Sequence, residues 1–130
     1  MKKILIAVCL VAVLALSVAF SLGNNPITPA VEPKADVVIP MSASRPGCEK
    51  TNWCFTPPEI TIESGKTVTW LNNDSGLHTV TSGYYDKPDG MFDSGHIDPD
   101  RTFSYMFEKA GDFHYFCNLH PWMEGTVIVK

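Results

Sequence analysis

From residue 59 onward the chain is built from short runs of β-branched and aromatic residues, each too short to form a stable helix. Residues 59–62, 67–71 and 102–107 alternate between polar and apolar side chains, which is the pattern of half-buried strands. Glycine, asparagine, aspartate and proline separate the runs and favour turns. The pattern predicts an all-β fold, a Greek-key sandwich of about seven or eight strands.

The order of the runs gives a coarse map of this domain. Residues 59–62 and 67–71 flank a short turn, which predicts that they are neighbouring strands. An extended run resumes at residues 77–80, and the last strand is predicted at residues 126–129. Residues 84–101 are rich in aspartate, glycine and proline, so we expect a long irregular connection there.

The N-terminal part of the chain differs in composition from this domain. Two lysines precede residues 4–20, an uncharged and strongly apolar run that is followed by polar residues. Residues 1–22 therefore have the features of a signal peptide or of an N-terminal membrane anchor, in which residues 4–20 would be the tether. Either interpretation places the rest of the chain outside the cytoplasm, in the periplasm or another extracytoplasmic compartment.

Residues 23–46 contain five prolines and few large apolar side chains, which predicts an extended linker. Within it, the short run at residues 37–39 has the composition of an added edge strand. The compact domain is predicted to span residues 47–130. This domain has twelve acidic and six basic residues, a net charge of −6 that argues against nucleic acid or an anionic membrane as its partner. Its acidity suits a basic protein partner, or simply keeps the domain soluble.

Cysteine usage also fits an exported domain. Outside the apolar N-terminal run, the chain has Cys48, Cys54 and Cys117. In an oxidising compartment, Cys48 and Cys54 are predicted to form a disulfide that closes a short loop and leaves Cys117 as a free thiol. The alternative, that Cys48 and Cys54 are metal ligands, is weaker because no histidine lies near them in the sequence.

The strongest chemical signal is the clustering of Cys117, His120 and Met123 within seven residues, between two predicted strands. A short loop fixed at both ends can direct a thiolate, an imidazole and a thioether at one point. His78 begins another extended run and is the candidate for a second imidazole. Two histidines and one cysteine with a weak axial methionine are the ligands of a blue-copper centre, so these four residues predict one mononuclear copper site.

The same segments resemble the cupredoxins. The runs 70–73, 77–80 and 111–117 are similar to the family's strands that lead to its first histidine and to its cysteine, and the Cys-x2-His-x2-Met spacing is closest to the amicyanin and plastocyanin-like group. The resemblance implies that His78, Cys117, His120 and Met123 bind copper, with the Thr79 backbone N–H a donor to the Cys117 sulfur. The disulfide-closed loop and the acidic connection depart from the amicyanin pattern.

A site of this kind implies a one-electron carrier that exchanges electrons with a redox protein donor and acceptor. Docking is predicted near His120, Pro121 and Trp122, where apolar groups surround the ligand expected to lie closest to solvent. Two other interpretations stay open. One is a small copper enzyme that acts on oxygen or a nitrogen oxide, which requires an open coordination position and therefore depends on Met123. The other is copper storage or delivery, or a structural zinc site.

Overall fold

The computed structural model describes residues 34–130, which form eight strands and one short 3₁₀ helix. The helix η1 (Cys48–Thr51) follows the first strand. The strands are β1 (Val37–Ile39), β2 (Glu59–Ile62), β3 (Lys66–Asn72), β4 (Thr81–Tyr84), β5 (Lys87–Asp93), β6 (Thr102–Phe107), β7 (Gly111–Cys117) and β8 (His120–Val129). The predicted all-β sandwich is confirmed, and the described residues contain no helix that is both long and apolar enough to cross a membrane.

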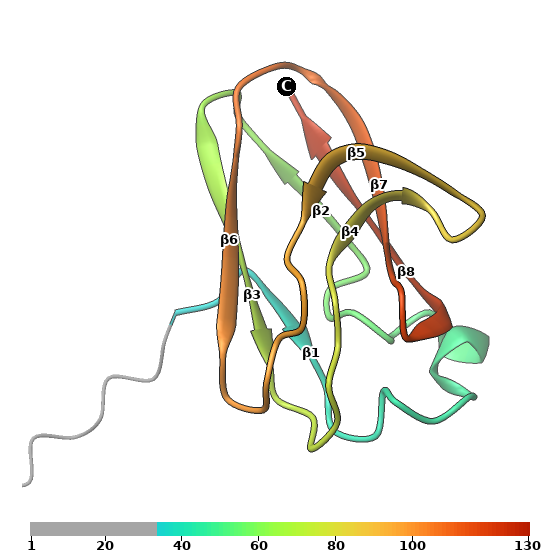
Figure 1. Cartoon of the computed structure of the whole chain (residues 1–130). Helices are drawn as coiled ribbons and strands as arrows, with labels where there is room; N and C mark the ends of the chain where they lie inside the picture. Colours follow the sequence, from blue (N-terminus) through green and yellow to red (C-terminus); the bar gives the residue numbers. More distant parts are fainter. Residues whose placement is uncertain (1–33) are drawn as a thin grey trace, which may run out of the picture. The chain divides into compact units, whose positions relative to one another are not determined.

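The strands form two sheets, which lie side by side in Figure 1. One sheet has the order β1-β3-β6, and the other has the order β2-β8-β7-β4-β5. β1 pairs with β3 and β2 pairs with β8 in parallel, whereas the remaining pairs are antiparallel. Sequence neighbours thus change sheets repeatedly, and strands distant in the sequence lie next to one another.

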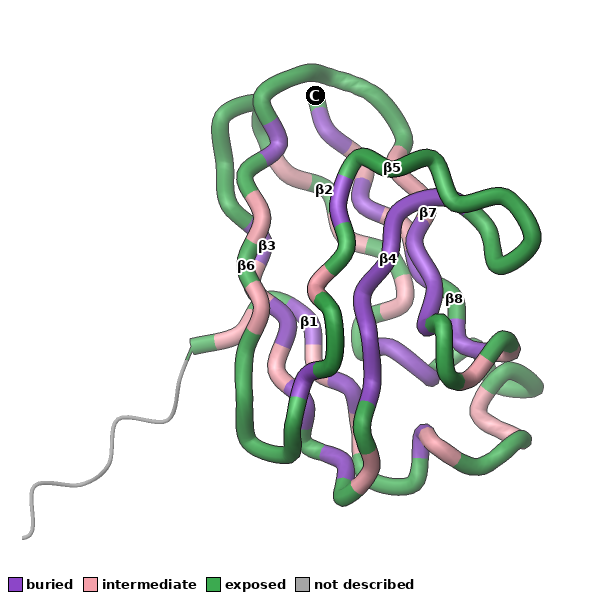
Figure 2. Tube along the Cα trace, viewed as in Figure 1, coloured by how far each residue is buried: buried purple, intermediate pink, exposed green. Residues whose placement is uncertain are grey.

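The core lies between the two sheets and is rich in aromatic side chains. Trp70 on β3 is fully buried, and its ring lies 5.4 Å from the Tyr115 ring on β7 and 5.7 Å from the Phe103 ring on β6. Figure 2 shows buried residues along β4 and in β7, while the turn between β4 and β5 is exposed. This core fixes the positions of β4 and β7, the two strands next to the predicted copper ligands.

Two predictions about the strands of the domain are wrong. β2 and β3 flank a turn but belong to different sheets, because β2 pairs with β8 and β3 pairs with β1 and β6. The predicted irregular connection contains the strand β5, in which only Phe92 is buried. An exposed edge strand needs no alternation of polar and apolar residues, so its sequence carries no strand signal.

The folded part begins before the predicted boundary at residue 47. Val37 and Ile39 on β1 are fully buried, and β1 pairs with β3 as the predicted added strand. The turns at residues 40–46 bring Ala43 into the core as well. Residues 37–46 are therefore part of the domain rather than of a linker. The predicted segment 1–22 and the first part of the predicted linker lie outside the described residues.

Candidate metal centre

Cys117 and His120 are positioned by the turn between β7 and β8. Cys117 is the last residue of β7 and pairs with His120, the first residue of β8, after an irregularity in the register between Phe116 and Cys117. Ser82 and Thr81 of β4 pair with Tyr115 and Phe116 of β7, so the strand before the turn is held on both sides. The turn is therefore short and anchored by strands, as the sequence predicts.

His78 comes from the segment that joins β3 to β4. Its backbone forms an isolated antiparallel bridge with Ile97, in which the His78 N–H and carbonyl bond to Ile97 at 3.3 and 2.8 Å. The buried Asn72 side chain donates to the carbonyls of Gly76 and Ile97, at 2.8 and 2.9 Å. These bonds hold the segment in place although β4 itself begins three residues later, at Thr81.

The structure brings His78, Cys117 and His120 together. One ligand atom from each residue lies within 4.8 Å of the other two. The Cys117 Sγ atom is 3.8 Å from His78 Nδ1 and 3.5 Å from His120 Nδ1, so both imidazoles present the same nitrogen to the sulfur. Met123 follows on β8 and is fully buried in the same core cluster as Cys117.

The environment of the Cys117 sulfur favours a thiolate. Burial alone would raise the pKa of Cys117, but His78 and the backbone N–H groups of Thr79 and Leu119 hold this pKa below its ordinary value. The Thr79 N–H donates to the sulfur at 3.3 Å, which confirms the predicted donor. Within residues 34–130, Cys117 is the free cysteine.

His78 has a partner that the sequence analysis missed. Its Nε2 atom lies 3.0 Å from Oδ2 of Asp74, and both side chains are buried. Burial alone would lower the pKa of His78, but Cys117 and Asp74 together raise it. His120 is half-buried, and burial together with the nearby His78 lowers its pKa.

The donor set fits copper. The buried Cys117 sulfur and two imidazoles lie within 4.8 Å of one another, and the buried Met123 thioether belongs to the same core cluster as this sulfur. Soft sulfur ligands suit Cu(I), while imidazole suits both oxidation states. A second group, Cys48, Glu49 and Cys54, also lies within ligand distance, but its two sulfurs form the predicted disulfide. This excludes the alternative of Cys48 and Cys54 as metal ligands.

Residues 43–130 match the family of copper binding proteins described as the plastocyanin/azurin family. The chain belongs to this family. Amicyanin from Paracoccus versutus is 31% identical over 125 residues, which is 95% of this chain and 93% of that protein. Plastocyanin from Scenedesmus fuscus is 33% identical over 92 residues, which is 65% of this chain and 94% of that protein.

A solved structure supports the same assignment. The purple cupredoxin from Nitrosopumilus maritimus superposes with a TM-score of 0.67 and 30% sequence identity, over 75% of this chain and 100% of that one. The predicted resemblance to the cupredoxins is thereby confirmed, and copper is the cofactor of this family member.

In this cupredoxin, residues 40–54 form a segment that we call the strap. It runs from β1 through a series of turns and η1 to the Cys48–Cys54 disulfide. The Trp122 Nε1–H donates to the Ala43 carbonyl at 3.2 Å, and Cys54 Sγ lies 3.8 Å from the Trp122 carbonyl oxygen. The strap therefore contacts the strand that carries His120 and Met123.

The other described histidines lie apart from the centre. His96 is exposed. His114 is partly exposed, because its ring stacks on Tyr84 at 4.0 Å and its Nδ1 lies 2.8 Å from the Gly83 carbonyl oxygen. Neither histidine belongs to the group of ligands described above.

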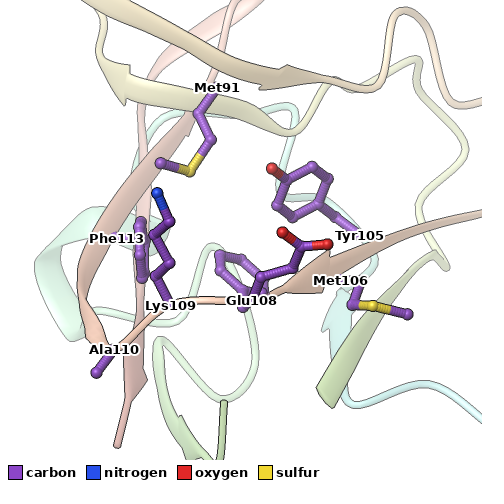
Figure 3. Close-up of a pocket in the computed structure, with 8 residues that line it drawn as sticks. Met91, Tyr105, Met106, Glu108, Lys109, Ala110 and Phe113 are labelled. Carbon is purple, nitrogen blue, oxygen red and sulfur yellow. The ribbon is translucent and has the colours of Figure 1, made fainter. Parts of the chain in front are cut away.

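A hollow of about 610 Å³ lies elsewhere, at the end of β6 distant from Asn72. Figure 3 shows Met91, Tyr105 and Phe113 around it, with Glu108 and Lys109 beside them. Its described lining contains no cysteine or histidine. The hollow is thus unrelated to the copper chemistry of the ligand cluster.

Proposed function

We propose that this cupredoxin is a one-electron carrier that works outside the cytoplasm and uses one type 1 copper ion. The observation that carries this proposal is the convergence of the Cys117 sulfur and two imidazole nitrogens within 4.8 Å of one another. Family membership supports the same conclusion, because the matching family model describes copper binding proteins.

We assign the ligands to four residues: His78, Cys117 and His120 form the trigonal set, and Met123 is the weak axial ligand. His78, Cys117 and Met123 are fully buried, so the surrounding protein holds three of the four side chains in place. Bound copper supplies the exchange of one electron between its Cu(I) and Cu(II) states. The role of the chain is to keep the four donors in one arrangement that serves both states, so that little has to move.

Two features argue against the other functions. An enzyme acting on oxygen or a nitrogen oxide needs an open coordination position, and four protein ligands leave none. A storage or delivery protein needs a metal that exchanges easily, whereas the Cys117 sulfur is buried and bonded to the Thr79 N–H. The carrier function therefore fits the centre best, and Met123 is the ligand on which the enzyme alternative depends.

The partner docks at the exposed edge of the centre. Among the four ligands, His120 is the one that is not fully buried, and exposed Pro121 and half-buried Trp122 follow it. Leu77 and Leu119, beside the two histidine ligands, are 41% and 42% exposed. These apolar side chains form a small surface of the kind that brief electron-transfer complexes use. The occupant is a redox protein that accepts or donates one electron.

An extracytoplasmic location has two supports. The Cys48–Cys54 disulfide is typical of an oxidising compartment. The apolar residues 4–20 follow a basic start, as in an export signal or anchor. Fractionation of the producing cells, with mass spectrometry of the mature N-terminus, would distinguish a cleaved signal from a retained anchor.

The ligand set is tested by spectroscopy of the full chain loaded with Cu(II). We expect an intense thiolate-to-copper absorption band that is lost in Cys117→Ser and shifted in Met123→Leu, with matching changes in the electron paramagnetic resonance spectrum. A spectrum without this band, or a band that does not respond to Met123, would contradict the four-ligand assignment and favour the enzyme or storage function.

The docking surface is tested by electron self-exchange between reduced and oxidised copies, which nuclear magnetic resonance (NMR) line broadening measures without knowledge of the partner. Leu119→Lys should slow self-exchange at least tenfold at low ionic strength, because it places like charges at the contact. Met106→Lys is the matched control, since Met106 is 53% exposed at the end of β6 distant from the centre. Equal rates for both variants would contradict the docking surface.

A further inference from the structure

Asp74 is buried, although it lies in the segment that joins β3 to β4. Its side chain is 1% exposed, and both carboxylate oxygens accept hydrogen bonds. Oδ1 accepts from the backbone N–H groups of Ser42 and Ser75, at 2.9 and 2.8 Å. Oδ2 accepts from the Ser44 N–H at 2.9 Å and lies 3.0 Å from His78 Nε2.

The direction of the bond to His78 follows from the geometry of the imidazole. His78 Nδ1 is the nitrogen that faces the Cys117 sulfur, so Nε2 is the nitrogen left for Asp74. An ionised carboxylate can only accept, and therefore Nε2 carries the proton and donates it. This arrangement leaves the Nδ1 lone pair free for the metal and fixes the plane of the ring.

The carboxylate is in turn fixed by the strap. Burial alone would raise the pKa of Asp74, but the Ser44 and Ser42 N–H groups and His78 lower it below its ordinary value. Ala43, between these two serines, is buried, and its carbonyl accepts the Trp122 indole N–H. The strap thus contacts the segment of His78 through Asp74, and the strand of His120 through Trp122.

We propose that the strap is a positioning element of the metal centre: the Ser42 and Ser44 amides hold the Asp74 carboxylate, and this carboxylate orients His78. The inference rests on the proposed role of His78 as a ligand. Asp74 is a positioning residue and does not touch the metal. The strap is the segment that the sequence analysis assigned in part to a linker.

The expected effect has a definite sign. A buried carboxylate behind the imidazole raises the basicity of the ligand and favours the more positive ion, Cu(II). Without it, the affinity for Cu(II) should fall by about 10–100-fold, the usual loss when an outer partner of a metal-ligating histidine is removed. The reduction potential should rise, because Cu(II) loses more stabilisation than Cu(I).

Asp74→Asn is the first test, in the full chain. Cu(II) affinity is measured by competition with a chelator, and the potential is measured by voltammetry. Asp36→Asn is the matched control, because the exposed Asp36 side chain also accepts a backbone N–H, that of Thr69 at 2.8 Å, but contacts none of the four ligands. Only Asp74→Asn should change the affinity and the potential.

Gly76→Ala tests the strap without altering Asp74 or His78. A Cβ atom at residue 76 would lie 3.2 Å from Ser44 Cβ and 3.3 Å from Ser44 Oγ, so Ser44 has to shift slightly to make room for the added methyl group. We expect a smaller rise in potential than in Asp74→Asn. Hydrogen exchange of the Ser42 and Ser44 amides should be faster in both variants than in the parent.

The outcomes separate this inference from the proposed function. If the parent shows the thiolate band but Asp74→Asn keeps the parental affinity and potential, the inference is overturned and the carrier function stands. If His78→Ala binds copper as the parent does, the ligand assignment itself fails. If Asp74→Asn does not fold, the inference is tested with Gly76→Ala and with the parent protein. Rapid hydrogen exchange of the Ser42 and Ser44 amides in the parent would also overturn the inference.

Discussion

At the scale of single residues, the contact between Tyr115 and Gly125 shows how closely the core is packed behind the metal centre. The two residues pair across β7 and β8, and a Cβ atom on Gly125 would overlap the Tyr115 ring. Phe55 packs edge-on to the same ring at 4.8 Å, which leaves it little room to move. Gly125 therefore permits a large aromatic residue to fill the interior beside β8.

Gly125→Ala should destabilise the protein by about 1–3 kcal/mol, the usual cost of overpacking a core. Denaturant unfolding followed by tryptophan fluorescence measures the change. Glu124→Ala, at the exposed neighbouring position, is the control and should change the free energy of unfolding by less than about 0.5 kcal/mol. Equal stability of Gly125→Ala and the parent would show that the Tyr115 ring moves aside.

Tyr115→Phe should behave differently. Among the described residues, the buried Tyr115 hydroxyl has no hydrogen-bond partner, and burial raises the pKa of Tyr115 above its ordinary value. Removal of an unpaired buried polar group costs nothing in hydrogen bonding, so the free energy of unfolding should stay equal or increase. A loss of more than about 1 kcal/mol in denaturant unfolding would instead reveal a partner for this hydroxyl.

Three of the four proposed ligands could be predicted from the sequence because they lie close together in it, and His78 was then the candidate for the second imidazole. Cys117, His120 and Met123 lie within seven residues, and few kinds of site other than a copper centre use these three side chains at that spacing. Asp74 could not be found in this way, because an aspartate in a turn is ordinary and its role depends on amides from a distant segment. Its position four residues before His78 was the one available signal.

At the scale of elements, the strap stabilises the fold as well as the metal centre. Its disulfide joins residues that are six positions apart, and Ala43 and Cys54 belong to the core cluster. In the chain-entropy model, closing a loop of this size lowers the entropy of the unfolded chain. This stabilises the folded state by about 2 kcal/mol. The strap therefore contributes to stability before any metal is bound.

Replacement of both Cys48 and Cys54 by serine should lower the free energy of unfolding of the metal-free protein by about 2 kcal/mol. Thermal unfolding of the variant and of the parent with and without reductant measures the effect. Reduced parent and double variant should unfold at similar temperatures. A double variant as stable as the oxidised parent would show that packing alone holds the strap.

Two strands show the limits of sequence patterns at this scale. β5 carries one buried side chain, Phe92. Its sequence therefore shows no alternation of polar and apolar residues that would predict its pairing with β4. β1 has only three residues and follows a proline-rich stretch, so the sequence marks it as an added strand but not as part of the core. In both cases pairing with a neighbouring strand, rather than local composition, determines the structure.

At the scale of the whole molecule, the copper centre and the fold should stabilise each other. Bound metal selects the native state, and copper at a thousand times its dissociation constant adds about 4 kcal/mol. The metal-loaded protein should therefore unfold at a higher denaturant concentration than the metal-free protein. Cys117→Ser is the control and should gain much less stability from the same metal. An equal gain would place the stabilising metal elsewhere.

His78 is held by its bridge to Ile97, whereas Cys117 is held by the turn between β7 and β8. These two parts of the chain meet only when the whole sandwich is folded. His78 and Cys117 are 39 residues apart, so no short fragment can recreate their meeting. The thiolate-to-copper absorption band expected of the oxidised protein should therefore report whether the whole domain is folded. Bleaching under heat or denaturant should coincide with the loss of the tryptophan signal, which makes a visible spectrum sufficient to count intact molecules.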